Sequence, residues 1–145
     1  MKWRGDVSMV VTLQQETAVS LADLLKLYGA AGWTAYTAEP DRLHKAVQRS
    51  LAVVTARDGD RLVGLIRAVG DGLTIIYIQD VLVLQAYRNR GIGSRLMACM
   101  IERYQNVRQK VLLTEEAPDV RCFYEKQGFV SCDRGSLVAF ARLSH

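Results

Sequence analysis

A glycine-rich loop between an apolar run and an amphipathic segment is the feature that most constrains the fold of this chain. Residues 74–83 are rich in isoleucine, valine, leucine and tyrosine, which predicts a central strand buried on both faces. Apolar residues recur at helical spacing over residues 91–104 and predict an amphipathic helix. The loop Arg88-Asn89-Arg90-Gly91-Ile92-Gly93 joins the two elements. Because the start of a helix carries unpaired N–H groups and a positive dipole end, the segment predicts an anion site.

The side chains of this loop suit a phosphate group. Gly91 and Gly93 remove side chains that would block close approach, and Ser94 adds a hydroxyl donor. The net charge of +4 is too small to choose among anionic partners. However, the densest basic group surrounds the loop, which favours a local anion site: Arg88, Arg90 and Arg95.

Spacing separates this loop from two other phosphate-binding loops. A Walker A loop is excluded because no Lys-Ser or Lys-Thr pair follows the second glycine at the required interval. A Rossmann loop is disfavoured because Leu96 stands where the third glycine belongs. The strands predicted upstream form hairpins and not the repeated βαβ units of a Rossmann domain.

The remaining pattern predicts an α/β fold in one domain, residues 1–145, with residues 1–8 as a loose leader and Met9 as an alternative start. The expected sheet is mixed and mostly antiparallel, with about six or seven strands, flanked by about four helices in the order β-α-α-β-β-β-α-β-α-β-β. The further strands are expected at Val7–Leu13, Leu51–Ala56, Leu62–Val69, Val111–Thr114, Phe129–Cys132 and Leu137–Arg142, and the further helices at Thr17–Tyr28, Pro40–Ser50 and Asp119–Gln127.

Residues 29–36 combine flexible glycines with two large aromatic residues, Trp33 and Tyr36. This composition is typical of a mobile loop with side chains that contact a ligand. We expect the segment to act as a lid over the substrate.

Two motifs in order resemble the GCN5-related N-acetyltransferase (GNAT) family. Arg88-x-x-Gly91-x-Gly93, preceded by Asp80-Val81-Leu82-Val83, resembles its motif A, and Phe123-Tyr124-Glu125-Lys126-Gln127-Gly128-Phe129 resembles its Phe-Tyr-x-x-x-Gly-Phe segment. The resemblance implies the GNAT acyl-CoA acyltransferase fold and transfer of acetyl from acetyl-CoA to a primary amine by direct attack. The following Asp133-x-Gly135 resembles the aralkylamine or serotonin acetyltransferase-like subgroup.

The resemblance also implies which residues bind acetyl-CoA. Backbone groups of Val81 and Val83, with Leu82 between them, would pair with the pantetheine arm and leave the thioester carbonyl near a strand amide. Arg88 would either contact phosphate or brace the loop. The pyrophosphate would be held by loop residues Arg88, Asn89, Arg90, Gly91, Ile92, Gly93 and Ser94.

The catalytic groups are less determined by the sequence. Tyr124 matches the family's proton donor to the departing thiolate, a reasonable role for a phenol, although it could instead be a packed aromatic residue. The amine must lose a proton before attack, and Asp80 is either the base or a structural partner, on the strand face opposite Gln79. Gln79 cannot serve as a base. Glu115 or Glu116 could collect the proton through water, and the substrate-binding residues are expected to be Trp33, Tyr36, Gln79 and Glu115.

Several alternatives stay open. A protein lysine or N-terminal acetyltransferase and a non-catalytic CoA-binding regulator remain admissible, and a homodimer is left open. No nucleic-acid recognition motif and no membrane-spanning apolar run are present in the sequence. The cysteines are odd in number and lack metal-ligand spacing, so we expect free thiols, a cytoplasmic location and no metal: Cys99, Cys122 and Cys132.

Overall fold

The computed structural model describes residues 10–144. The expected leader, the alternative start Met9 and the first residues of the strand predicted from Val7 lie outside the described residues. The chain forms two compact units, one ending at Leu113 and the other beginning at Thr114. Each unit is described by itself.

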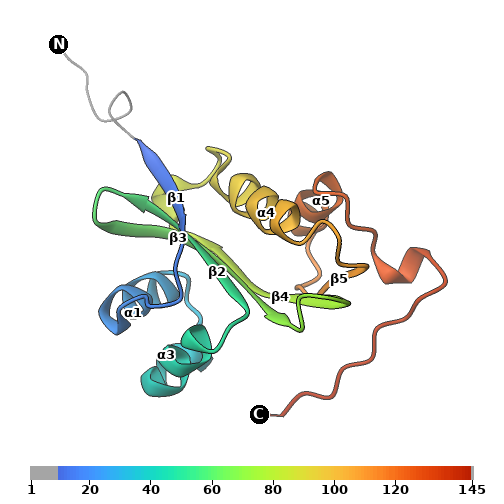
Figure 1. Ribbon diagram of the computed structural model, residues 1–145, viewed down its shortest axis with the longest axis horizontal. Coiled ribbons are helices and arrows are strands. Elements are labelled where there is room, and N and C mark those ends of the chain that lie inside the picture. The colour runs from blue at the N-terminus through green and yellow to red at the C-terminus, as the bar shows by residue number, and fades with distance from the viewer. Residues whose placement is uncertain (1–9, 145) are drawn as a thin grey trace. The chain divides into compact units, whose positions relative to one another are not determined.

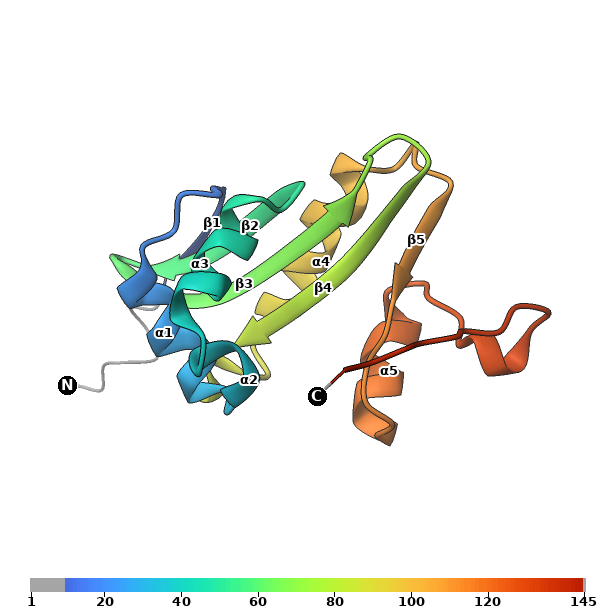
Figure 2. The ribbon, with the colours of Figure 1, turned by 90° about the horizontal axis from the view of Figure 1, so that it is seen from below.

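The first unit is built on a five-stranded sheet in the order β1-β2-β3-β4-β5. The pairs β1–β2, β2–β3 and β3–β4 are antiparallel, whereas β4 and β5 are parallel, so the sheet is mixed and mostly antiparallel as predicted. Figure 2 shows the long β3 and β4 side by side. The strands are β1 Val11–Gln15, β2 Ala52–Asp58, β3 Arg61–Gly70, β4 Ile75–Val83 and β5 Gln109–Leu112.

Helices cover both faces of this sheet, as predicted (Figure 1). The helices α1 Leu21–Ala30, α2 Thr34–Thr37 and α3 Pro40–Gln48 belong to one face, and α4 Ile92–Arg103 belongs to the other. Ser20 caps α1 by accepting a hydrogen bond from an N–H of its first turn, and Pro40 begins α3. The apolar stripes of α1 and α3, with Val19 just before α1, are buried in one cluster with strand residues: Val19, Leu24, Leu27, Tyr28, Leu43 and Val47 with Val53, Leu62, Leu65 and Leu82.

The two hairpin turns follow from short polar sequences. Gly59 has a φ of 61° between β2 and β3, a conformation that glycine adopts without strain. Between β3 and β4, the carboxylate of Asp71 accepts hydrogen bonds from the N–H groups of Leu73, Thr74 and Ile75. These bonds hold the pKa of Asp71 well below its usual range, because they stabilise the charged form.

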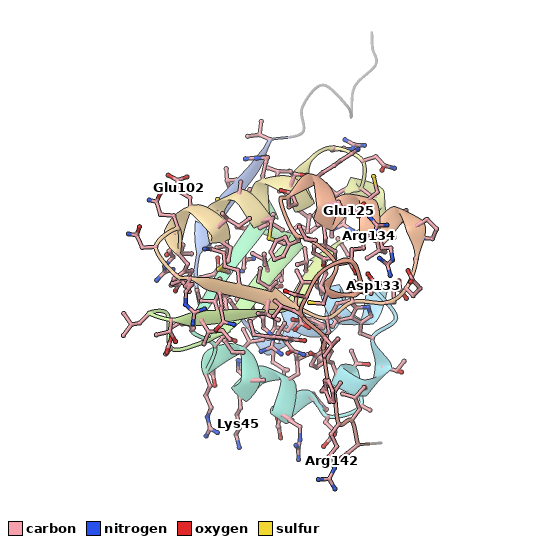
Figure 3. All side chains as sticks on the ribbon, turned by 90° about the vertical axis from the view of Figure 1, so that its right-hand side faces the viewer. Lys45, Glu102, Glu125, Asp133, Arg134 and Arg142 are labelled. Atoms are coloured by element: carbon pink, nitrogen blue, oxygen red, sulfur yellow. The ribbon has the colours of Figure 1, made fainter. Side chains whose placement is uncertain are left out.

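The second unit contains one helix, α5 Pro118–Lys126, and a short 3-10 turn, η2 Cys132–Arg134. Figure 3 shows Glu125, Asp133 and Arg134 close together in this unit, where Arg134 pairs with Glu125 at 2.8 Å. The strands predicted at Phe129–Cys132 and Leu137–Arg142 do not form. A strand requires a partner, and no strand is assigned within residues 114–144 of this unit. The described sheet therefore has five strands instead of six or seven, and the described helices number five instead of about four.

Candidate functional site

The glycine-rich loop contains two left-handed residues between β4 and α4. It runs from the end of β4 through the 3-10 turn η1 Gln85–Tyr87 to the start of α4. Asn89 and Gly91 are left-handed, with φ values of 62° and 78°. Such residues turn nearby N–H groups toward one side of the chain. Gly91 is the N-cap of α4 and makes no side-chain cap, so the cap residue itself does not occupy the space in front of the first-turn N–H groups.

The structure gives two reasons for glycine at position 91. Its positive φ is a conformation that other residues adopt only with strain. A Cβ placed there would meet no atom within 4 Å, so the side of Gly91 that a substituent would fill is open. The loop residues therefore fit a phosphate or pyrophosphate group.

Side chains brace the base of the loop. The Arg88 guanidinium donates a hydrogen bond from Nε to the carbonyl of Val83 at 3.2 Å, which corresponds to the bracing role considered for it. The hydroxyl of Tyr87 donates to the Asp58 carboxylate on β2 at 2.6 Å. Both bonds start at the C-terminal end of η1 and reach β2 or the end of β4, so the loop is tied to the sheet before α4 begins.

The fourth and fifth strands separate beside this loop. The strand β5 pairs only with Ile75–Ile78, whereas β4 continues for five residues to Val83. Across from β3, the register shifts between Arg67 and Ala68, so that Gln79 is the extra residue of a β-bulge. A bulge bends its strand and increases the local twist. The stretch Gln79–Val83 therefore has no strand partner on the β5 side among the described residues, which leaves a backbone edge that an extended ligand can follow.

The bulge also corrects the expectation that Asp80 and Gln79 lie on opposite faces of β4. Both side chains bond to the hydroxyl of Tyr36: it donates to Asp80 Oδ1 at 2.9 Å and accepts from Gln79 Nε2 at 3.1 Å. Strict strand alternation would point neighbouring side chains apart. The extra residue at the bulge breaks that alternation and gathers both side chains around one hydroxyl.

Asp80 is the centre of a buried polar network. Asp80 as a whole residue is 3% exposed, and its carboxylate also accepts hydrogen bonds from the Tyr28 hydroxyl at 2.8 Å and from Arg67 Nε at 2.5 Å. Burial disfavours the charged form of Arg67 and by itself would lower its pKa. The adjacent Asp80 carboxylate has the opposite effect, and the pKa of the guanidinium is raised overall. Burial and the same carboxylate raise the pKa of Tyr28. Because the carboxylate is already bonded to three donors, the geometry favours the structural-partner role over the role of base.

The aromatic residues expected in a mobile lid are packed instead. The segment 29–36 contains the end of α1 and the start of α2, and is not an irregular loop. The Trp33 and Tyr36 rings stack at a centroid distance of 6.0 Å, and both pack edge to face against Tyr28. Burial raises the pKa of Tyr36. The mutual packing and the bond from Tyr36 to Asp80 explain why this glycine-containing segment is ordered onto the sheet.

The proposed proton donor lies in the second unit. Tyr124 is half-buried on α5, with ring centroids 5.0 Å from Phe123 and 6.1 Å from Phe129. Burial raises the pKa of its phenol, and a hydrogen bond with the Thr114 side chain opposes that effect. The phenol is therefore both packed and hydrogen-bonded.

Of the two glutamates that precede α5, one is engaged. Glu116 accepts hydrogen bonds from Arg121 at 2.6 and 2.7 Å. Glu115 is exposed. Glu116 is therefore paired with Arg121 whereas Glu115 is exposed to solvent, so Glu115 is the better candidate to contact a ligand.

Sequence reasoning missed Arg67, Tyr28 and the bulge at Gln79. Arg67 is the only charge within the apolar run Leu62–Val69, and a lone charge in a strand buried on both faces requires a buried partner. That signal could have identified Asp80 as the partner. The bulge leaves no comparable signal, because no glycine or proline marks Gln79.

None of the helices within residues 10–144 is long and apolar enough to cross a membrane. In the same part of the chain, no three His, Cys, Asp or Glu side chains are grouped as metal ligands.

Comparisons with known proteins agree on one family. Residues 49–131 match the family model of an acetyltransferase (GNAT) domain. A GNAT-family acetyltransferase from Streptococcus pneumoniae is 36% identical in sequence, with a TM-score of 0.84 over 93% of this chain and 98% of the other. A protein of unknown function from methicillin-resistant Staphylococcus aureus, described as a probable acetyltransferase, is 25% identical, with a TM-score of 0.76 over 92% of this chain and all of the other.

The curated relative is more distant. The uncharacterized N-acetyltransferase ycf52 of Porphyra purpurea is 26% identical over 123 residues, which are 83% of this chain and 70% of the relative. An aminoglycoside acetyltransferase from an uncultured soil sample, in complex with sisomicin, shares the fold at 15% identity and a TM-score of 0.67, over 92% of this chain and 97% of the other. The fold class predicted from the two motifs is confirmed. The subgroup suggested by Asp133-x-Gly135 stays a prediction.

Proposed function

This chain belongs to the GNAT family of acetyltransferases, and from that premise we propose that it moves an acetyl group from acetyl-CoA to the primary amine of a small molecule. The enzyme class, an acyltransferase, follows from the family. One observation carries the proposal. The N-terminus of α4, where Gly91 makes no side-chain cap, follows directly on the part of β4 that does not pair with β5. Acetyl-CoA suits both features, because its pyrophosphate can bind at a helix N-terminus and its pantetheine arm can pair with an open strand edge.

The donor end of the proposed site uses mainly backbone groups. N–H groups of the loop 88–94 hold the pyrophosphate. Arg88 braces the loop through its hydrogen bond to the carbonyl of Val83. Backbone groups of Val81 and Val83, on either side of Leu82, pair with the pantetheine arm. When bound, acetyl-CoA supplies an acetyl thioester that an amine can attack directly. The loop residues assigned to this role are Arg88, Asn89, Arg90, Gly91, Ile92, Gly93 and Ser94.

The acceptor end uses the polar and aromatic groups around the bulge. Trp33 and Tyr36 present an aromatic surface to the amine, and Gln79 is held by the Tyr36 hydroxyl so that its amide can orient the amine. Asp80 positions Tyr36 and Gln79 through the buried network. The amine attacks as a free base, because an ammonium has no lone pair. Glu115 receives its proton through water.

The leaving group completes the reaction. As the bond between the acetyl carbon and sulfur breaks, Tyr124 donates its phenolic proton to the departing sulfur and is reprotonated from solvent. Because the pKa of Tyr124 is raised, its phenol stays protonated up to a higher pH than the phenol of an ordinary tyrosine. The products are the acetamide and free CoA.

Replacing Tyr124 with phenylalanine is expected to lower kcat by about 100-fold, because only the proton donor is lost while the aromatic packing against Phe123 and Phe129 remains. Tyr104→Phe removes a phenol at the end of α4, outside the proposed site, and should leave kcat unchanged. Steady-state kinetics of both variants between pH 6 and about 10 would measure this. Unchanged rates for Tyr124→Phe at every pH would remove the phenol from the mechanism.

The substrate class is tested by release of the CoA thiol from acetyl-CoA. The panel contains polyamines, aralkylamines, amino acids, aminoglycosides and lysine peptides, with the aminoglycosides included because structural neighbours acetylate them. Turnover of a small amine is the expected result. Turnover of lysine peptides alone would favour the protein-modifying alternative, and binding of acetyl-CoA without turnover of any amine would favour the regulator.

We propose the cytoplasm as the location of the protein, since Cys99, Cys122 and Cys132 are free thiols.

A further inference from the structure

The hydroxyl of Tyr36 lies at a junction where the direction of each hydrogen bond is determined. A tyrosine hydroxyl has one hydrogen to donate and two lone pairs that accept. Its hydrogen goes to Asp80 Oδ1 at 2.9 Å, because a carboxylate that pairs with a guanidinium only accepts. Arg67 Nη2 donates to the same hydroxyl at 3.3 Å, and a guanidinium has no atom that accepts. The hydroxyl therefore has one lone pair left for its third partner, Gln79.

This remaining lone pair determines the orientation of the Gln79 side-chain amide. The amide has one group that donates, Nε2, and one atom that accepts, Oε1. Since the hydrogen of the Tyr36 hydroxyl is already given to Asp80, Gln79 can bond to that hydroxyl only through Nε2, and the contact at 3.1 Å joins these two atoms. Gln79 is exposed, and no group among the described residues of the first unit is bonded to its Oε1. The bulge of β4 therefore offers an acceptor to a ligand, and not a donor.

Burial keeps this order of hydrogen bonds fixed. The Arg67 and Asp80 side chains are 6% and 2% exposed, so water does not replace either partner. The Tyr28 hydroxyl donates to Asp80 Oδ2 at 2.8 Å, and Ser50 Oγ accepts from Arg67 Nη1 at 3.3 Å. A reversed hydroxyl at Tyr36 would leave a buried carboxylate oxygen without this donor, which is costly. The buried ion pair thus sets which atom of Gln79 is available.

We propose that Gln79 is a specificity-determining residue, whose Oε1 accepts a hydrogen bond from an N–H of the acceptor amine and thereby selects primary amines. Asp80 and Arg67 are positioning residues that act through the Tyr36 hydroxyl. This role rests on the acetyl transfer proposed above and names the atom that contacts the amine. The Tyr36 hydroxyl itself has no bonding capacity left for the substrate, so only its ring contacts the amine.

The number of hydrogens on the amine explains the selection. The lone pair of the nitrogen forms the new bond to the acetyl carbon, the carbon–sulfur bond breaks with its electrons on sulfur, and one N–H hydrogen leaves as a proton through water. A primary amine keeps a second hydrogen that bonds to Gln79 Oε1 throughout, whereas a secondary amine has only the hydrogen that must leave. Because positive charge develops on the attacking nitrogen, this bond is stronger in the transition state. Gln79 exchanges no proton.

The orientation of the amide is tested without turnover, by NMR of the isotopically labelled full-length chain. The side-chain NH2 signals of Gln79 are identified by their absence in Gln79→Met, which keeps the length of the side chain. Their exchange with water should be about fivefold faster in Tyr36→Phe, because one neutral hydrogen bond is lost while the ring remains. Equal exchange rates in the wild type and Tyr36→Phe would overturn the orientation, whether or not any amine is acetylated.

A double-mutant cycle in the kinetics shows whether the Tyr36 hydroxyl acts through Gln79. Gln79→Met is expected to lower kcat/KM for the amine by about 10-fold, and Tyr36→Phe by about fivefold, with KM for acetyl-CoA unchanged. The double variant should lose no more than Gln79→Met alone, since the hydroxyl has no role once the amide is absent. Losses that multiply to about 50-fold would contradict this route and assign the hydroxyl its own contact with the amine. Tyr104→Phe, which removes a phenol at the end of α4, is the matched control.

Specificity is measured with primary amines and their N-methyl analogues: phenethylamine, butylamine and Nα-acetyl-lysine amide. The wild type should prefer the primary member of each pair that it acetylates, and this preference in kcat/KM should fall about 10-fold in Gln79→Met. Methionine and glutamine are similar in size, so crowding by the N-methyl group is similar in both proteins. An unchanged preference would overturn the specificity role and leave the acetyltransferase in place. No turnover of any primary amine would overturn the proposed function and this role together, while the NMR signals still report the orientation.

Discussion

Gly91→Glu is expected to weaken acetyl-CoA binding by roughly 100-fold, which corresponds to about 2.7 kcal/mol. A Cβ at position 91, the N-cap of α4, would meet no protein atom within 4 Å apart from its chain neighbours. A carboxylate there would compete with the pyrophosphate for the same N–H groups and repel it. The fold should survive, because the loop remains tied to the sheet through Arg88 and Tyr87.

The matched control is Gly59→Glu in the turn between β2 and β3. Gly59 also has a positive φ, 61° against 78° at Gly91, and a Cβ there would likewise meet no atom within 4 Å. The backbone strain, on the order of 1 kcal/mol, and the added charge are therefore similar at the two positions. Calorimetric titration with acetyl-CoA and thermal unfolding would be measured for both. Equal loss of affinity in the two variants, or none in Gly91→Glu, would contradict the location of the anion site.

Local patterns explain why the centre of the fold could be predicted. The strand β4 begins one residue after the predicted start, and α4 begins and ends within one residue of the predicted helix. Both elements are long and strongly periodic, and the loop between them contains glycines whose conformational role is visible in the sequence. Gly91 was predicted to be functional on spacing, and its left-handed φ adds a physical reason that spacing alone does not contain.

The features that sequence reasoning missed depend on residues far apart in the chain. The buried bond between Tyr28 and Asp80 joins positions 52 residues apart, and no local pattern predicts it. The bulge at Gln79 depends on the register with β3. The predicted closing strand Leu137–Arg142 has the composition of a strand, but no strand is assigned to it among the described residues of its unit, so propensity alone did not decide its structure.

Asp80→Asn should lower the free energy of unfolding by about 3–5 kcal/mol, because it leaves the buried guanidinium of Arg67 without a counter-charge. The Arg67 and Asp80 side chains are only 6% and 2% exposed. The double variant Arg67→Met with Asp80→Leu removes both charges and should recover much of this loss. Glu39→Gln breaks a pair with Arg42 whose side chains are 59% and 80% exposed, and should change stability by less than about 1 kcal/mol. Denaturant unfolding measures all three.

Kinetics of the same variant separate the two roles considered for Asp80. If Asp80 positions the Tyr36 hydroxyl and through it Gln79, Asp80→Asn should raise KM for the amine and leave the shape of the pH profile of kcat/KM unchanged. If Asp80 were the base, the same variant would lose the limb of that profile that reports proton removal, while KM changed little. The buried network therefore predicts a stability loss and a binding loss together, and a variant that stayed fully stable but lost that limb would restore Asp80 as the base.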